Sequence, residues 1–342
     1  MVSLIHLPIE PFPQRYTEDW LHWYRAEAQG LANVSGLKEE FILGECVYKE
    51  IEHGSFLDVT GTMIYKSTQI ARVVEWIKIN LKTQDWANTV FFFHDLWHPG
   101  VIDLMYVRDG MSLPFKIVGM LHAGSYDQYD FLNKQGMTKW ASGFERSVFN
   151  NVDAIFVATE FHKEMLCYDR VLSPDLIQVT GFPIYPRPLA ECPRDLDVVF
   201  PHRLDSEKQP HLFDDIACRM SGYVFEKTAI LNMSKSEYFH RLNRYKVAVS
   251  FALQETWGIA MQECVFAGCI PLVPDRLSYS EMYPEIFKYQ DLKDCIQKLD
   301  YLIRYREDSR IKNAWCDLYN VLAARGRFAI PLQKKAILDL CQ

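Results

Sequence analysis

The chain has 342 residues, of which 49% are hydrophobic and 24% charged, which suits a globular protein with two cores. No apolar run approaches the roughly 20 residues that span a bilayer, and the first residues lack the basic and apolar segments of a signal peptide. The nine cysteines form no CxxC pair. We therefore expect reduced thiols, a cytoplasmic location and no membrane insertion.

The net charge is −7, and it is unevenly distributed. Residues 1–180 carry 15 Lys and Arg against 23 Asp and Glu, a balance of −8, and the rest of the chain is close to neutral. A protein that follows a long duplex by neutralising phosphates presents a basic surface. We therefore expect any contact with nucleic acid to be local.

In the first half, apolar runs typical of buried strands alternate with amphipathic helical segments. A helix is expected over 66–82, because apolar residues recur there at helical spacing. Strands that are apolar throughout and separated by helices indicate a parallel sheet covered on both faces. The expected strands are LIHLPI (4–9), EFILGEC (40–46), TVFFFHDL (89–96), FKIVGMLHA (115–123), AIFVAT (154–159) and LIQVTGF (176–182).

A proline-rich stretch, 181–195, is typical of a linker between domains. Strands expected at LDVVFPHRL (196–204), TAILNM (228–233), YKVAVSFAL (245–253) and CIPLVPD (269–275) then alternate with helices that begin at Gln209, Ser234 and Glu255. The sequence predicts two Rossmann-like, doubly wound α/β domains facing each other across a cleft. They cover residues 1–182 and 183–325, and a C-terminal helix, 326–342, is expected to cross back to the first domain.

One stretch, SFALQETWGIAMQECVFAGCIPLVPD (250–275), combines two apolar strands with two carboxylates at the ends of a short helix. Ligands of open α/β sheets bind beyond the carboxyl ends of strands, which is where Glu255, Thr256, Trp257 and Gly258 follow. Gly258 permits close backbone approach, and the N–H groups of the first helical turn favour an anion. Glu263 lies about two turns further on.

Two carboxylates so placed suit an extended ligand with hydroxyls at both ends and phosphate between, such as a sugar nucleotide. The alternative is that both glutamates are solvated helix residues. The segment PHRLDSEKQPHLF (201–213), after another strand, adds Arg203 and Lys208. Arginine offers a forked donor to phosphate oxygens and lysine a mobile charge, a suitable pair for a diphosphate; two surface cations near a helix start are the alternative.

These motifs together resemble the retaining GT-B glycosyltransferases with an E-x7-E signature, in the order HRLxxxEK, ETWG, second Glu and AGCIPLVPD. The resemblance covers the second half and implies that Arg203 and Lys208 hold the donor diphosphate. It further implies that Glu255 faces the donor sugar and Glu263 holds the ribose hydroxyls. Thr256, Trp257 and Gly258 replace the family's usual small-aromatic-Gly turn and are expected to contact donor through their backbone.

The first half resembles the family more loosely. KIVGMLHAGSYD puts His122 at the end of an apolar strand, where the family often has a histidine facing the donor sugar. The family's glycine-rich loop after the first strand is absent. EPFPQRYTEDWLHWY (10–24), with SFLDVTGT (55–62) and FFFHDLWHPG (91–100), is similar to a group of bacteriophage-encoded glycosyltransferases associated with sugars on modified pyrimidines of phage DNA.

Acceptor candidates come from the same first half. Arg15 and Tyr16 lie near a strand end, whereas Trp20, Trp23 and Tyr24 have the spacing of one buried helix face. Asp95 is expected either to contact an acceptor or to cap the next helix. His94 is expected either at the edge of the cleft or in a packing role.

Metal sites are not expected. His94 and His98 have the spacing of a helical metal pair, but they follow a strand and precede Pro99, so helical geometry across them is not expected. Asp195 and Asp197 start a strand at its amino end, away from the ligand end. The fold implied by the resemblance stabilises its leaving diphosphate with Arg, Lys and helix N–H groups, without a metal or other cofactor.

The leading hypothesis is a glycosyltransferase that moves a sugar from a nucleotide-diphosphate sugar, such as a UDP-sugar, to an acceptor hydroxyl with retention. The preferred acceptor is a hydroxymethylated pyrimidine in phage DNA, such as 5-hydroxymethylcytosine; a cell-surface glycan or a tRNA base is the runner-up. Two other classes remain open: a non-catalytic sugar-nucleotide-binding module and a sugar-phosphate epimerase on the same fold.

Overall fold

The computed structural model describes the whole chain except residues 14, 31–35, 48–57 and 189–191. Parts of three sequence motifs (the segments 10–24, 55–62 and 181–195) therefore lie outside the described residues. The chain divides into two compact units. The first consists of 1–158, 162–183 and 328–342, and the second of 159–161 and 184–327.

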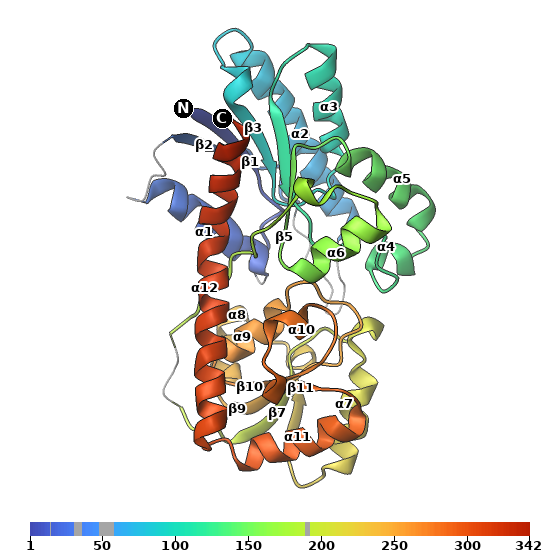
Figure 1. Ribbon diagram of the computed structural model, residues 1–342, viewed down its shortest axis with the longest axis vertical. Helices are drawn as coiled ribbons and strands as arrows, with labels where there is room; N and C mark the ends of the chain where they lie inside the picture. The colour runs from blue at the N-terminus through green and yellow to red at the C-terminus, as the bar shows by residue number, and fades with distance from the viewer. Residues whose placement is uncertain (14, 31–35, 48–57, 189–191) are drawn as a thin grey trace. The chain divides into compact units, whose positions relative to one another are not determined.

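The first unit is built on a parallel sheet of six described strands in the order β2-β1-β3-β4-β5-β6. Figure 1 labels four of them, β1, β2, β3 and β5. Helices α2, α3, α5 and α6 separate successive strands. The strands are β1 (Val2–Leu7), β2 (Leu37–Phe41), β3 (Thr89–Phe93), β4 (Lys116–Met120), β5 (Ala154–Val157) and β6 (Ile177–Val179). The helices are α1 (Tyr16–Gln29), α2 (Val59–Asn80), α3 (Gly100–Gly110), α4 (Phe131–Lys134), α5 (Thr138–Phe149) and α6 (Glu160–Asp169), and the end of α12 (Ser309–Leu340) also belongs to this unit.

The first unit has apolar side chains on both faces of its sheet, because alternate residues of a strand point to opposite sides. Phe91 and Phe93 pack on one side with residues of α2 and α3, and Phe92 lies on the other, 5.9 Å from the ring of Tyr24 in α1. Trp20 and Tyr24 are both buried. This burial agrees with the packing interpretation of the α1 aromatics.

The second unit repeats the pattern with a sheet in the order β11-β10-β9-β7-β8, also parallel. The described strands are β7 (Leu196–Phe200), β8 (Phe225–Lys227), β9 (Tyr245–Val249), β10 (Ile270–Pro274) and β11 (Lys288–Tyr289). The helices are α7 (Pro210–Arg219), α8 (Lys235–Leu242), α9 (Ile259–Phe266), α10 (Ser278–Met282), α11 (Leu292–Arg304) and the first part of α12. Two units of parallel sheet and helices confirm the predicted α/β class.

Three predicted elements are wrong in extent. β2 ends at Phe41, so most of 40–46 is not strand. The strand predicted at 228–233 is instead β8, at 225–227; Thr228–Ile230 form a 3-10 helix, and Ile230 is 63% exposed, so this apolar run does not enter the core. The helix predicted from Glu255 begins only at Ile259. Among the helices of the described residues, none is both long and apolar enough to cross a membrane.

Candidate active site

The second unit brings Lys208 and Glu255 together beyond the carboxyl ends of β7 and β9. Lys208 ends a short 3-10 helix, Ser206–Lys208, and Glu255 lies in the loop between β9 and α9. The Lys208 ammonium donates to the Gln254 carbonyl, 2.5 Å away, and lies 3.3 Å from Glu255 Oε2. The Leu253 N–H donates to the Glu207 carbonyl at 2.7 Å, which ties the two loops together.

Two further side chains hydrogen-bond to the backbone of the loop that carries Glu255. Arg276, after β10, donates to the carbonyls of Phe251 and Ala252 at 2.9 and 3.0 Å. The Tyr289 hydroxyl, from β11, donates to the Ser250 carbonyl at 2.8 Å. Lys208, Arg276 and Tyr289 thus donate to this loop from the ends of β7, β10 and β11. The sheet therefore fixes the position of the Glu255 loop. Sequence reasoning missed both Arg276 and Tyr289.

The charges around Glu255 favour its ionised form. Burial opposes ionisation of this carboxyl, but the Lys208 cation and the Gly258 N–H together hold its pKa below the ordinary value. His202 is itself buried, and burial, reinforced by the Lys208 cation, lowers its pKa to about 3. At neutral pH the cluster is therefore a carboxylate, an ammonium and a neutral imidazole.

Gly258 has a left-handed backbone, with φ of 70°, and caps the start of α9. A Cβ at this position would lie 3.0 Å from Cε1 of Tyr279. The Gly258 N–H donates to Glu255 Oε1 at 2.9 Å, so in this structure it serves the carboxylate instead of an anionic ligand. Thr256 and Trp257 are both buried.

Glu263 lies within α9 instead of at its end, because the helix starts at Ile259. Its Oε2 accepts a hydrogen bond of 3.2 Å from the hydroxyl of Tyr238 in α8. Burial, together with the Glu263 carboxylate, raises the pKa of Tyr238 well above its ordinary value, so Tyr238 stays a donor. The sequence offered no signal for this pair, which joins two helices.

Arg203 follows β7 and is engaged by acidic neighbours. Its Nη1 lies 2.9 Å from Asp205 Oδ2, and its Nη2 lies 3.6 Å from Glu207 Oε1. The side chain is 38% exposed. A phosphate would therefore compete with two carboxylates for Arg203.

In the first unit, His122 and His94 lie together at the carboxyl ends of β4 and β3. His122 Nε2 donates to the His94 carbonyl at 2.8 Å, and the His94 ring bonds to His6 of β1 at 3.0 Å. The His122 ring packs against Trp20 and Phe182, with centroids 5.1 and 4.8 Å away. Burial lowers the pKa of both His94 and His122, so both are neutral at pH 7.

Asp95 follows His94 and is paired with a lysine that sequence reasoning missed. Asp95 Oδ1 accepts from the Trp97 N–H at 3.1 Å, and Oδ2 lies 3.8 Å from the ammonium of Lys66 in α2. Lys66 also donates to the Trp97 carbonyl. Asp95 thus orders its own loop and does not cap α3, whose N-cap position is Pro99.

Arg15 and Tyr16 lie at the start of α1. The Arg15 guanidinium lies 5.6 Å from the centroid of the Phe12 ring, and the Tyr16 ring lies 4.9 Å from that of Trp20. Both side chains are half-buried. The two candidates therefore pack against the aromatic residues around them.

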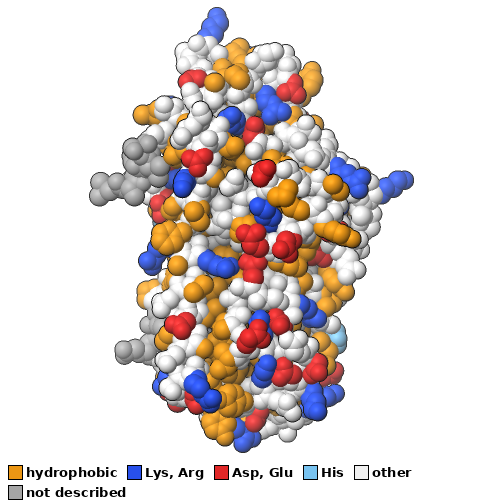
Figure 2. Space-filling model, viewed as in Figure 1, with side chains coloured by type: hydrophobic (Ala, Val, Ile, Leu, Met, Phe, Trp, Pro, Cys, Tyr) orange, Lys and Arg blue, Asp and Glu red, His pale blue; other side chains and the backbone are white. Residues whose placement is uncertain are grey.

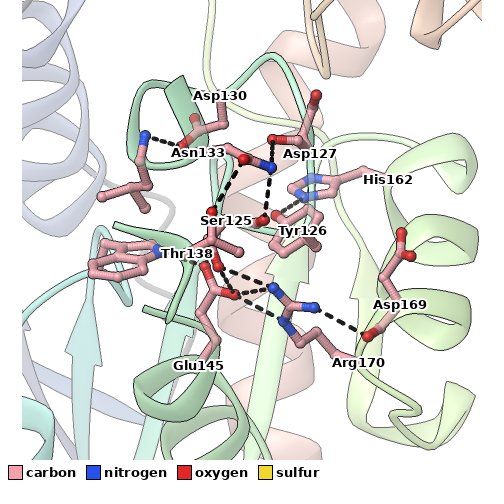
Figure 3. A network of polar contacts seen from close by, with 12 residues as sticks. Ser125, Tyr126, Asp127, Asp130, Asn133, Thr138, Glu145, His162, Asp169 and Arg170 are labelled. Atoms are coloured by element: carbon pink, nitrogen blue, oxygen red, sulfur yellow. Dashed lines mark hydrogen bonds and ion pairs between the residues drawn. The ribbon is translucent and has the colours of Figure 1, made fainter. Parts of the chain in front are cut away.

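A buried acidic side chain anchors the loops after β3 and β4 (Figure 3). Glu145 of α5 is fully buried and accepts from the Ser125 hydroxyl at 2.8 Å and from Trp97 Nε1 at 3.2 Å. Arg170 neutralises it, with Nη2 2.6 Å from Oε2. The ion pair therefore fixes the loop of Asp95 and Trp97 against the loop that follows His122.

No group of three or more His, Cys, Asp or Glu side chains within the described ranges has the arrangement of a metal site. His98 bonds through its ring to Gln69 at 3.1 Å and to the Gly100 N–H at 3.0 Å. Asp197 pairs with Lys246, and Asp195 pairs with Arg244. These four candidate ligands (His94, His98, Asp195 and Asp197) thus all have other partners.

Comparison with solved structures identifies the architecture. Sucrose-phosphate synthase from Thermosynechococcus elongatus superposes with a TM-score of 0.67, covering 99% of this chain and 98% of that one at 11% identity. Anabaena HepE in complex with UDP and glucose gives 0.60, covering 99% of both chains at 9% identity. The chain has the GT-B fold. TarM from S. aureus, in complex with UDP and other ligands, gives 0.56 over 80% of this chain and 59% of that one, at 12% identity.

Sequence comparison gives less information about the chain than the structural comparison does. No family model matches it. It is 27% identical over 141 residues to the tRNA-queuosine alpha-mannosyltransferase of Drosophila melanogaster. That match covers 32% of this chain and 37% of the relative, so the chain spans little more than a third of the curated protein.

Proposed function

We propose that this protein is a glycosyltransferase that moves a sugar from a nucleotide-diphosphate sugar to an acceptor hydroxyl, with retention at the anomeric carbon. The observation that carries the proposal is the Lys208–Glu255 pair, 3.3 Å apart beyond the carboxyl ends of β7 and β9. Ligands of open α/β sheets bind at this edge. The GT-B fold and the UDP held by the solved HepE and TarM structures agree with it.

The donor would bind along the second unit. Lys208 and Arg203 would hold the diphosphate, and Glu255 would orient the sugar. Glu263 would accept hydrogen bonds from the ribose hydroxyls, and its bond to Tyr238 sets the direction of its carboxylate. Thr256, Trp257 and Gly258 would contact the donor through their backbone.

In the transfer step, the bond between the anomeric carbon and the diphosphate oxygen breaks and its electron pair leaves with the diphosphate. The acceptor oxygen bonds to the anomeric carbon from the same face, and the hydroxyl proton passes to the departing diphosphate. Lys208 and Arg203 would stabilise the charge that develops on the leaving group, which is electrostatic preorganisation and requires no metal. His122, neutral at pH 7, would contact the sugar or the attacking hydroxyl.

The acceptor we propose is a hydroxyl on a modified nucleobase of tRNA. The support is the match to the tRNA-queuosine alpha-mannosyltransferase, whose name states its own acceptor. On the face drawn in Figure 2, acidic and basic side chains are mixed, and residues 1–180 carry an excess of acid, which favours a local contact over the tracking of a long duplex. The bacteriophage-like segments favour a second candidate, a hydroxymethylated pyrimidine in DNA.

The test is a transfer assay with labelled nucleotide-diphosphate sugars and two acceptors, queuosine-containing tRNA and hydroxymethylcytosine DNA. The same tRNA and DNA without the modified bases serve as controls. We expect label in the tRNA from one donor, and Glu255→Gln should lower transfer at least a hundredfold while the protein stays folded. Label in the DNA alone would select the second acceptor. Near-normal turnover by Glu255→Gln would contradict the role given to this carboxylate.

A further inference from the structure

The pair of Lys66 and Asp95 in the first unit has unused hydrogen-bonding capacity. Among the described residues, the Lys66 ammonium makes one hydrogen bond, to the Trp97 carbonyl, although it carries three N–H groups. Its distance to Asp95 Oδ2 is 3.8 Å, too long for a direct hydrogen bond. Asp95 uses its other oxygen, Oδ1, to accept from the Trp97 N–H.

Both groups are partly withdrawn from water, which makes unused donors and acceptors costly. The Lys66 side chain is 17% exposed and that of Asp95 is 23% exposed, so the pair is sheltered yet still reachable from outside. A polar contact longer than 3.5 Å between such groups can be bridged by an oxygen that lies beside the pair. A hydroxyl at that position would accept from Lys66 and donate its hydrogen to Asp95 Oδ2.

The position of the pair in the fold agrees with ligand binding. Asp95 follows β3, and Glu10 follows β1, the neighbouring parallel strand, so both lie beyond carboxyl ends at one edge of the sheet. Glu10 is buried and accepts from the Thr62 hydroxyl of α2 at 3.1 Å. The loop of Asp95 is fixed by the bond from Trp97 to Glu145.

We propose that Lys66 and Asp95 bind the acceptor hydroxyl, and that the acceptor group at this site is a neutral or cationic polyol and not a phosphate. Among the described residues, three carboxylates (Asp95, Glu10 and Asp58) surround two cations, Lys66 and Arg15. Because acidic groups are in excess, an anionic group would be repelled while hydroxyl and ammonium groups would be attracted. This inference rests on the proposed function for its purpose, but its binding chemistry does not require turnover.

The experiment is saturation-transfer NMR with three probes that share one ring at millimolar concentration: glucosamine, glucose and glucose 6-phosphate. We expect wild-type protein to bind glucosamine at least threefold more tightly than glucose, and glucose 6-phosphate more weakly than either. Asp95→Asn should abolish the preference for glucosamine, and Lys66→Met should weaken glucose binding at least fivefold. Lys246→Met removes a lysine that pairs with an aspartate elsewhere and should change neither, and Lys208→Met reports binding at the donor edge.

Equal probe binding by wild type, Lys66→Met and Asp95→Asn would overturn the inference. So would the absence of sugar binding to wild type, a preference for glucose 6-phosphate, or a loss caused by Lys208→Met in place of Lys66→Met. Unfolding midpoints within a few degrees of wild type show that the variants are folded. Failure of the proposed function is seen separately, as a lack of binding by nucleotide-diphosphate sugars in a titration without acceptor.

Discussion

Replacing Lys208 with methionine tests the electrostatics of the candidate site without any substrate. The change keeps the length of the side chain and removes the ammonium that lies 3.3 Å from Glu255. Only 8% of the Lys208 side chain and 18% of that of Glu255 are exposed. Removing one partner of a buried ion pair costs about 3–5 kcal/mol. Because Glu255 keeps the bond from Gly258 and some solvent, we expect a loss of about 2–3 kcal/mol at pH 7.5.

The pH dependence gives the sharper result, because the contribution of Glu255 changes sign. In wild type its pKa is below the ordinary value of 4.5, so its contribution to stability is present above that pH and is lost as the pH falls through the folded-state pKa. Without Lys208, burial, the largest influence, raises the pKa. Stability is then greatest below about pH 4.5 and is lost as the pH rises through the raised pKa.

The assay is urea unfolding at pH 5.0 and pH 7.5. Between pH 5.0 and pH 7.5, the unfolding free energy of Lys208→Met should fall by about 1 kcal/mol relative to that of wild type. The double variant Lys208→Met/Glu255→Gln is the control: without the charged carboxyl, it should recover much of the loss at pH 7.5. Equal losses at both pH values in the single variant, with no recovery in the double variant, would refute this reasoning.

Three further substitutions test other parts of the structure. Tyr238→Phe removes the 3.2 Å bond to Glu263 and should weaken binding of a nucleotide-diphosphate sugar about fivefold by calorimetry, with unchanged affinity as the contrary result. Gly258→Ala places a Cβ at φ of 70° and 3.0 Å from Tyr279, so it should lower the unfolding free energy in urea by about 1–2 kcal/mol; a neutral effect would mean that the turn adapts. Burial raises the pKa of Asp130, which caps α4, to about 7. Its contribution to the unfolding free energy is therefore complete below the unfolded-state pKa of the carboxyl and is lost as the pH rises through 7. Asp130→Asn keeps the cap and should flatten the stability profile between pH 5.5 and 8 by about 1–2 kcal/mol, and an unaltered profile would contradict the raised pKa.

The alternation of apolar strands and helices was sufficient to predict the α/β class, because parallel strands covered on both faces leave a continuous apolar signal. Phe91, Phe92 and Phe93 illustrate this, since all three are buried although they point to opposite faces. Short edge strands were harder to locate. In the part of the chain that the structure describes, β8 pairs only with β7, and its three residues carry little of the hydrophobic pattern. The neighbouring run 228–233 is more apolar and was predicted as the strand in its place.

The sequence pointed to Lys208 and Glu255 through the strands that precede them, since adjacent parallel strands deliver their carboxyl ends to one edge. It could not supply the partners of two other predicted site residues, Glu263 and Asp95. Tyr238 reaches Glu263 across 25 residues, and Lys66 reaches Asp95 across 29, and neither contact leaves a spacing pattern. Glu255 was expected to start a helix, but the left-handed turn at Gly258 delays that start to Ile259.

The most direct test of the central claim is a calorimetric titration of UDP-, GDP- and ADP-linked sugars into wild-type protein and Glu263→Ala. A nucleotide-sugar site predicts that one donor binds wild type selectively and binds Glu263→Ala at least tenfold more weakly, because the ribose hydroxyls lose their acceptor. If no donor binds wild type, or if the selected donor binds both proteins equally, the second unit does not hold a nucleotide sugar in the way proposed.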